Sequence, residues 1–421
     1  MGSPRIRQLL ELAATLSGVI VYTSANGFMT GGLAVAGRQV GVSEIEVGAI
    51  LGLGALVGVV IAPLWGYAAE IWSRRKLMLL AVPMITLGPA AVAIITAHSA
   101  LLPMAAVGFA LGAARLVQAA FGAASIPVAQ AFIANMTTPD HRVRGMGGLS
   151  AVVSSGTLIG SALLWVTGRF GVATGFAAVA SFGAAACVLV FAFLPDAGPR
   201  MKLQPGETAL PLVRISPYLL ITFVGFISYT LVPPIFALRL MDRFGQEGGT
   251  AAAQTGFVLT VGVLAVCIAQ ALIAVRSNWN ILIMLRAGAA GILLGLVMLL
   301  MATDLLEMCI AMGVIGFSVG FIAPANLGAI SLAAGRGAQG KVGGLNMAAR
   351  GLGTAIGPVV GTTLYSMSVD APIYGSLVLV GILLVMTFLV PARDGRHPVV
   401  SAADNQSFSK DTLIWRDHRE R

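Results

Sequence analysis

The chain has 421 residues, of which 57% are hydrophobic and 10% are charged, and its mean hydropathy is +0.91. A soluble domain of this size cannot cover so much apolar surface with so few charges, which excludes a soluble globular protein. The formal net charge is +9, but the cations fall in short loops and a tail without interleaved aromatic residues, so we expect no nucleic-acid partner. Cys187, Cys267 and Cys309 lie in apolar runs without metal-ligand spacing, and we expect no metal and no other cofactor.

Apolar runs long enough to cross a membrane as helices follow one another along the chain, since each span needs about 20 apolar residues. The predicted helices cover residues 9–36, 46–69, 77–97, 101–134, 143–168, 171–194, 215–240, 254–275, 281–303, 306–334, 342–368 and 372–391. The Pro-rich, charged segment 195–217 is predicted to be a cytoplasmic linker between two halves, 1–194 and 218–391, and residues 392–421 a flexible tail. We therefore predict an all-α membrane protein with 12 transmembrane helices in two six-helix halves.

Lysine and arginine are distributed unevenly between the two sides of this topology. With both termini in the cytoplasm, basic residues on the cytoplasmic side outnumber the outer ones by roughly five to one. The outer ones are Arg38, Arg169, Arg239 and Arg243. Because cytoplasmic loops of multi-pass proteins carry such an excess, we expect a protein of the cell (inner) membrane with both termini cytoplasmic. We expect it to be a monomer surrounded by membrane lipid.

The two predicted halves repeat each other in sequence. Pro127 and Pro324 lie 197 positions apart, and the Gly-Gly-Leu strings at 147–149 and 343–345 lie 196 positions apart. Several matches at nearly one offset are typical of a duplicated structural unit, which many membrane transporters contain. The repeat therefore supports two pseudo-symmetric halves.

A charged turn joins the helices expected at 46–69 and 77–97, with the sequence GYAAEIWSRRK from Gly66 to Lys76. It resembles the loop between the second and third helices of the major facilitator superfamily, whose usual form is G-x-L-A-D-R-x-G-R-[RK]-x. Glu70 stands in place of Asp, and Ser73 replaces the second Gly. The resemblance implies a secondary transporter of twelve helices that works by alternating access. We interpret Gly66, Glu70, Arg74, Arg75 and Lys76 as a conformational latch that stabilises the outward-open state, the alternative being an ordinary positive-inside loop.

Two further stretches resemble the same family. The family's fourth helix carries R-x-x-Q-G, and here Arg115 and Gln118 match while Ala119 replaces Gly. The exporter branch carries G-x-x-x-G-P on its fifth helix; Gly156 and Gly160 match in part, and the fuller form, residues 353–358, lies on the helix expected at 342–368. The resemblance covers residues 9–391 and in part indicates the exporter branch.

Arg115 is the first candidate for substrate binding, because a cation deep in a membrane helix is costly unless it pairs or faces water. Gln118 is three positions on and shares its face. The alternative is a structural arginine that bonds backbone carbonyls of a neighbouring helix. Asn26 and Asn326 are polar residues in other predicted spans, for which an interhelical hydrogen bond is the alternative.

Arg350 is a second arginine inside a predicted helix, closer to the cytoplasmic end. Asn346 lies one turn before it on the same face, and both are predicted to contact substrate. The alternative for Arg350 is a side chain that extends to the membrane interface.

Two arginines within predicted spans and the scarcity of acids there favour an anionic substrate. If transport is coupled to protons, Glu11 and Glu70 are the candidates for the titrating group. We predict export of a small organic molecule, with an anionic, siderophore-like carboxylate preferred. The alternatives are a multidrug:proton antiporter, which should carry a carboxylate in mid-span, and, from another class, a non-transporting receptor or a membrane enzyme.

Overall fold

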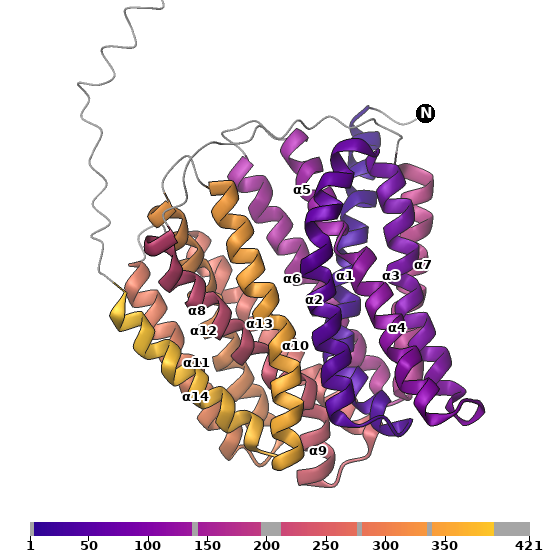
Figure 1. Ribbon diagram of the computed structural model, residues 1–421, viewed down its shortest axis with the longest axis vertical. Coiled ribbons are helices and arrows are strands. Elements are labelled where there is room, and N and C mark those ends of the chain that lie inside the picture. The colour runs from indigo at the N-terminus through magenta and orange to yellow at the C-terminus, as the bar shows by residue number, and fades with distance from the viewer. Residues whose placement is uncertain (1–3, 137–141, 195–211, 276–279, 335–338, 391–421) are drawn as a thin grey trace, which may run out of the picture.

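The computed structural model describes residues 4–136, 142–194, 212–275, 280–334 and 339–390, and every regular element among them is helical (Figure 1). This confirms the all-α class. The elements are α1 (Pro4–Gln39), α2 (Glu44–Ile71), α3 (Arg74–Ala97), η1 (Ser99–Leu101), α4 (Met104–Gly122), α5 (Ser125–Met136), α6 (Arg142–Gly168), α7 (Val172–Phe193), α8 (Leu212–Leu231), η3 (Pro233–Ile235), α9 (Phe236–Phe244), α10 (Gly248–Val275), α11 (Ile281–Met301), α12 (Leu305–Ala334), α13 (Gln339–Met367) and α14 (Ala371–Leu389).

The predicted linker and tail fall largely outside the described residues. Of the linker, only residues 212–217 are described, and they form the first turns of α8 instead of a loop. The predicted tail, 392–421, lies entirely outside. The boundaries of the two halves therefore remain predictions.

Eleven stretches among the described residues are long and apolar enough to cross a membrane. The remaining long helix is α13, which contains Lys341, Asn346 and Arg350 and has no stretch as apolar as those eleven. Helix α13 packs extensively on both α2 and α8, so neighbouring helices cover much of a surface that lipid would otherwise contact. Counted with α13, the described residues contain twelve helical segments long enough to cross a membrane, as predicted.

The helix predicted at 101–134 is divided in two. Helix α4 ends at Gly122, and α5 begins at Ser125 with Pro127 in its first turn. Proline suits that position, since the first N–H groups of a helix have no intrahelical acceptor. One candidate membrane span, Ala105–Gln130, runs through both helices.

The helix predicted at 215–240 is also divided, because Pro233 and Pro234 lack the N–H groups that a continuing α-helix needs. Helix α8 ends at Leu231, a 3₁₀ turn follows, and α9 then runs on to Phe244. Gly245 terminates α9 with φ of 64°, a left-handed conformation that glycine adopts readily. The segment therefore extends further than predicted and carries Asp242 in its last turn.

The connections between helices fall on two sides of the molecule. We call the side with the start of α1 and the α2–α3 turn the terminus side, which lies at the upper end in Figure 1. The opposite, distal side carries the turns after α1 and after α9, and α9 lies at the lower end of the same view.

Glycines allow the helices to approach closely at equivalent places in the repeat. On α6, a Cβ at Gly160 would collide with the backbone of Ser24 in α1, and the Ser24 hydroxyl donates to the carbonyl of Gly156 (2.9 Å). On α13, a Cβ at Gly357 would collide with Thr230 of α8. Small residues at such crossings are what drive helix association in a membrane. The sequence repeat thus corresponds to one kind of close helix contact that occurs twice, between α6 and α1 and between α13 and α8.

Helices α1–α7 form one group and helices α8–α14 a second group. The two groups meet mainly where α2 packs on α13 and where α6 packs on α10. Two of the close contacts lie toward the distal side. Gly48 near the start of α2 lies against Thr362, and Gly168 at the end of α6 lies against Ala253. Helices α2 and α13 accordingly approach each other toward the lower end of Figure 1.

The same helices are separated near the terminus side. A Cβ added at Gly66 of α2, at Gly148 of α6 or at Gly344 of α13 would meet no atom within 4 Å. Each of these helices makes close contact with the other group nearer the distal side. The described contacts therefore close the molecule on the distal side and leave these helix ends apart on the terminus side.

Candidate functional site

Arg115 lies in the middle of α4, and only 7% of it is exposed. Its Nη1 donates hydrogen bonds to Asn26 Oδ1 of α1 (2.7 Å) and to Gln118 Oε1 (2.9 Å). The structure thus brings together three of the residues predicted to bind substrate. Gly54 of α2 makes room for the guanidinium, since a Cβ there would lie 2.8 Å from Arg115 Nε.

We call Arg115, Gln118 and Asn26 the Arg115 cluster. It has more buried hydrogen-bond donors than acceptors. Arg115 Nε and Gln118 Nε2 are both buried, and neither has an acceptor among the described residues. Leaving a buried donor unsatisfied costs about 1–3 kcal/mol. The observed partners of the guanidinium are neutral amides, not the backbone carbonyls of the structural alternative. The cluster is therefore suited to an additional acceptor, and a carboxylate or other anion would also balance the charge.

Arg350 is exposed, and its guanidinium carbon lies 4.7 Å from the centre of the Phe226 ring. It interacts electrostatically with Tyr229 of α8 and with Tyr22 of α1. Tyr22 also interacts with Arg115. Because Tyr22 belongs to the opposite group of helices, the exposed Arg350 side chain faces the interface between the two groups.

Asn326 and Asn346 belong to a second cluster, which Thr222 connects. The Thr222 hydroxyl donates to Asn346 Oδ1 (2.7 Å) and accepts from Asn326 Nδ2 (2.8 Å). Asn326 also donates to the carbonyl of Tyr218 (2.9 Å) and is only 3% exposed. In this conformation the pair joins α8, α12 and α13 and does not contact the Arg115 cluster through any described hydrogen bond.

The aromatic residues beside the arginines were missed from the sequence. Tyr22 lies four positions before Asn26, and Phe226 and Tyr229 are three positions apart on α8. Such spacings place residues on one helix face, so the signal was present. It does not distinguish aromatic residues at an interface between helices from those that face lipid.

The predicted latch is only partly described, because the side chains of Glu70 and Arg74 lie outside the described set. Arg75 Nη2 donates to the carbonyl of Phe191 near the end of α7 (3.1 Å), and its guanidinium lies 5.9 Å from that ring. The Lys76 N–H donates to Ser73 Oγ, which caps α3 (3.4 Å). Gly66 faces open space. The described latch residues thus contact their own group of helices.

Glu11 lies in the second turn of α1 and is partly exposed. Its backbone carbonyl accepts a hydrogen bond from Thr15 Oγ1 (2.9 Å). It is close to the terminus side, far along α1 from Asn26, which contacts Arg115.

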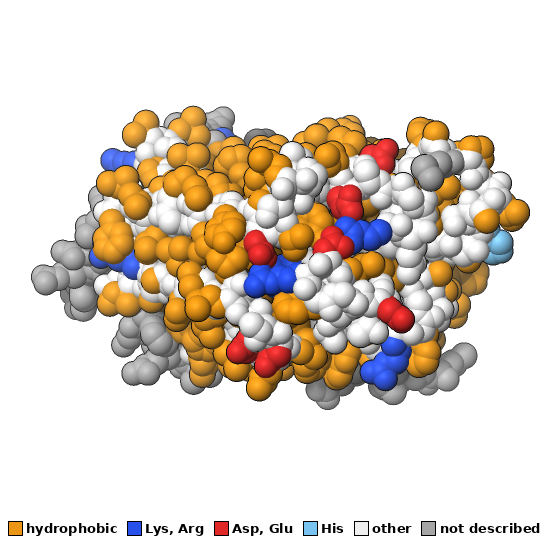
Figure 2. Space-filling model, turned by 90° about the horizontal axis from the view of Figure 1, so that it is seen from below, with side chains coloured by type: hydrophobic (Ala, Val, Ile, Leu, Met, Phe, Trp, Pro, Cys, Tyr) orange, Lys and Arg blue, Asp and Glu red, His pale blue; other side chains and the backbone are white. Residues whose placement is uncertain are grey.

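A network of ion pairs lies on the distal side. Arg38, in the last turn of α1, bonds Asp242 of α9 through two nitrogens (2.6 and 3.0 Å) and Glu44 at the start of α2 (2.6 Å). Tyr365 of α13 also donates to Asp242. Figure 2, which views this side, shows basic and acidic side chains in contact near the middle of the surface, among hydrophobic and uncharged groups. The Arg38–Asp242 pair crosses from one group of helices to the other.

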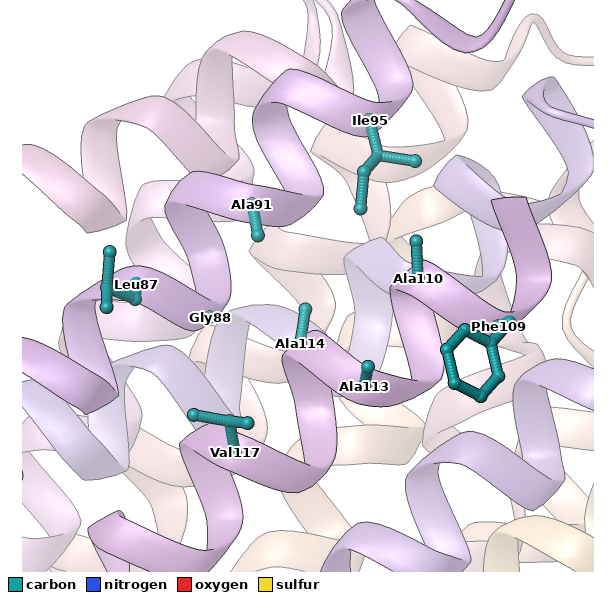
Figure 3. A pocket seen from close by; sticks show the side chains of 9 residues that line it. All are labelled: Leu87, Gly88, Ala91, Ile95, Phe109, Ala110, Ala113, Ala114 and Val117. Atoms are coloured by element: carbon teal, nitrogen blue, oxygen red, sulfur yellow. The ribbon is translucent and has the colours of Figure 1, made fainter. Parts of the chain in front are cut away.

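A cavity of about 470 Å³ opens between α3 and α4, as Figure 3 shows. Its lining is apolar and includes Leu87, Phe109 and Val117. Phe109 is 81% exposed, so the cavity opens toward the outside of the helix bundle. It contains none of the predicted site residues and offers no group that would bind an anion.

A family model described as the Major Facilitator Superfamily matches residues 14–358 and, in a second alignment, residues 218–420. Multidrug resistance protein 1 of Bacillus subtilis (strain 168) is 27% identical over 278 residues, covering 63% of this chain and 70% of that protein. The crystal structure of a D-xylose–proton symporter matches with a TM-score of 0.71 at 16% identity, covering 90% and 97% of the two chains. That of a human organic anion transporter matches with a TM-score of 0.62 at 16% identity, covering 92% and 100%.

Proposed function

Since this chain belongs to the major facilitator superfamily and is a transporter, not an enzyme, we propose that it exports a small organic carboxylate by alternating access. The single observation that carries this proposal is the Arg115 cluster. There a membrane-buried guanidinium is bonded only to neutral amides, and two neighbouring donors lack acceptors. The proposed substrate supplies the acceptor oxygens and the compensating charge.

The proposed substrate site lies between Arg115 and Arg350. Arg115, Gln118 and Asn26 bind the carboxylate from one group of helices, and Arg350 contributes positive potential from the other. Tyr22 lies near both arginines, which supports a common site between the groups. Asn346 and Asn326 join this site if their cluster with Thr222 opens during the cycle, and otherwise serve as interhelical bonds.

Alternating access requires that two ends of the site open in turn. The distal contacts and the separated helix ends on the terminus side support one of these two states. If the termini are cytoplasmic, as the charge distribution predicts, this state is inward-facing. In the proposed cycle the halves 1–194 and 218–391 rock about the site and then close on the terminus side.

The latch at Gly66, Glu70 and Arg74–Lys76 belongs to the other state in this proposal. Its contacts with the second group of helices form when the terminus side closes, so it biases a two-state equilibrium without touching substrate. The open space beside Gly66 is compatible with a latch that is disengaged in this conformation. Glu70 and Glu11 are the acids that we propose for proton coupling, because both lie toward the terminus side.

Transport into proteoliposomes tests the proposal. Purified protein should move radiolabelled organic carboxylates across the bilayer and should not move ethidium, since a cation would meet two uncompensated arginines. Arg115→Lys keeps the charge but loses the paired N–H geometry, so it should be impaired for carboxylates. Robust ethidium transport that added carboxylates do not reduce would contradict the proposal.

A multidrug:proton antiporter is the second candidate. The curated relative that matches this chain is named as a multidrug resistance protein, which supports export and a broad substrate range. One observation disfavours this candidate: among the described residues, no acid is bonded to Arg115 or Arg350. Ethidium transport in the assay above would favour this candidate.

A further inference from the structure

We infer that the substrate site selects aryl carboxylates, acids whose carboxylate is attached to a planar aromatic ring. The inference deepens the proposed function and rests on it, since it assigns the group that accompanies the carboxylate. It starts from three aromatic residues: Tyr22, which lies near both arginines, and Phe226 and Tyr229, which lie beside Arg350.

Tyr22 is held in place beside the Arg115 cluster. A Cβ added at Gly122 of α4 would collide with its ring, so the ring packs closely against α4 one turn beyond Gln118. Its hydroxyl points toward Gly58 of α2, where an added Cβ would lie 3.8 Å away. Glycines on both neighbouring helices thus position an aromatic ring within reach of a ligand on Arg115.

The opposite wall carries two rings and an arginine. Phe226 and Tyr229 pack edge to face, with ring centres 6.1 Å apart and an interplanar angle of 70°. The Arg350 guanidinium carbon lies over the Phe226 ring, 4.7 Å from its centre. No described residue accepts a hydrogen bond from this guanidinium, and Tyr229 is 39% exposed. An uncovered face of Arg350 and an accessible Tyr229 ring therefore remain available.

A planar ring matches these surfaces better than a saturated one. A guanidinium attracts the negative face of an aromatic ring, and aromatic side chains stack on or meet the edge of such a ring. A saturated ring of similar size offers only van der Waals contact. With the carboxylate on Arg115, an attached ring extends from α4 past Tyr22 toward α8 and α13, where Arg350 and Tyr229 lie.

The test compares two acids of matched size and charge, 2-naphthoate and its saturated analogue decahydro-2-naphthoate. Calorimetric titration of the purified full-length protein in detergent measures both affinities. We expect 2-naphthoate to bind about three- to tenfold more tightly. Tyr229→Leu should remove most of this preference, because it should weaken the binding of 2-naphthoate more than that of the saturated acid, and Phe226→Leu should do the same if the variant remains monodisperse.

Arg115→Gln serves as the matched control, because it should weaken both acids to a similar extent. Equal binding of the two acids by the wild-type protein, with both weakened by Arg115→Gln, would overturn the aryl preference and leave the carboxylate site in place. Binding of neither acid would overturn the inference together with the proposed function. A preference for 2-naphthoate that survives both Tyr229→Leu and Phe226→Leu would also overturn it, since these rings would then not cause the preference.

Discussion

The Arg38–Asp242 ion pair should act as a gate on the distal side, and Asp242→Asn tests this. The pair joins α1 to α9, and so crosses between the two groups of helices. The bond from Tyr365 to Asp242 stays within one group, and the bond from Arg38 to Glu44 stays within the other. Of these three contacts, Arg38–Asp242 is the one that must break when the distal side opens.

The size of the effect follows from the exposure and geometry of the pair. The side chains are 25% and 37% exposed, so solvent screens the charges in part. An exposed ion pair contributes about 0.2–1 kcal/mol, and a bidentate arginine–carboxylate pair more. We therefore expect Asp242→Asn, which keeps the shape of the side chain, to destabilise the distal-closed state by about 1–1.5 kcal/mol. The population ratio of distal-open to distal-closed molecules should rise about five- to tenfold.

Electron–electron distance measurements between two spin labels report this equilibrium. Ile45 at the start of α2 and Ser368 after α13 are both exposed on the distal side and belong to opposite groups of helices. The labels require a background in which the native cysteines are replaced: Cys187, Cys267 and Cys309. Asp242→Asn should increase the population at the longer distance.

Glu44→Gln is the matched control for this experiment. It removes the same charge from the same arginine, but the lost bond lies between α1 and α2 in one group. The distance distribution should therefore stay as in the wild-type protein. An unchanged distribution in Asp242→Asn, or an equal shift in Glu44→Gln, would refute the gate.

Arg115→Ala should abolish transport while expression and membrane insertion stay near normal; full activity would refute a substrate contact, and loss of folded protein would favour a structural role. Glu70→Gln should lower turnover more than substrate affinity if the latch biases a conformational equilibrium, and a loss of affinity alone would contradict that role. Asn326→Leu should lower the free energy of unfolding by about 1 kcal/mol or less, and a loss of substrate binding without a loss of stability would show instead that Asn326 contacts the ligand. Gly160→Leu should prevent folding because its side chain would collide with α1, whereas Gly148→Leu on the same helix should be tolerated; similar yields of the two variants, measured by size-exclusion chromatography, would refute the close packing.

The sequence alone determined the class of the molecule. Apolar runs of membrane-spanning length indicate a multi-pass, all-α membrane protein, because lipid accepts no unsatisfied backbone groups. The charged turn at 66–76 pointed to the superfamily, and the family match confirms it. The spacing of Arg115 and Gln118 placed them on one face, and the hydrogen bond between them follows from that helical geometry.

The interruption of a helix at adjacent prolines is a local property that the sequence itself carries. The apolar run continues without a break across Pro233 and Pro234, so its length alone predicts a single helix. The missing backbone N–H groups decide otherwise and separate α9 from α8. As a result the acid Asp242, which was not singled out from the sequence, became part of a distal ion-pair network.

Only the tertiary structure decided which residues meet across the chain. Arg38 and Asp242 are 204 positions apart, and Thr222 and Asn346 are 124 apart. Within one helix the period of 3.6 residues fixes which side chains share a face, but the packing of one helix on another depends on where glycines permit close approach. Gly54, Gly122 and Gly160 set those approaches, and a local sequence pattern does not encode the partner that each glycine receives.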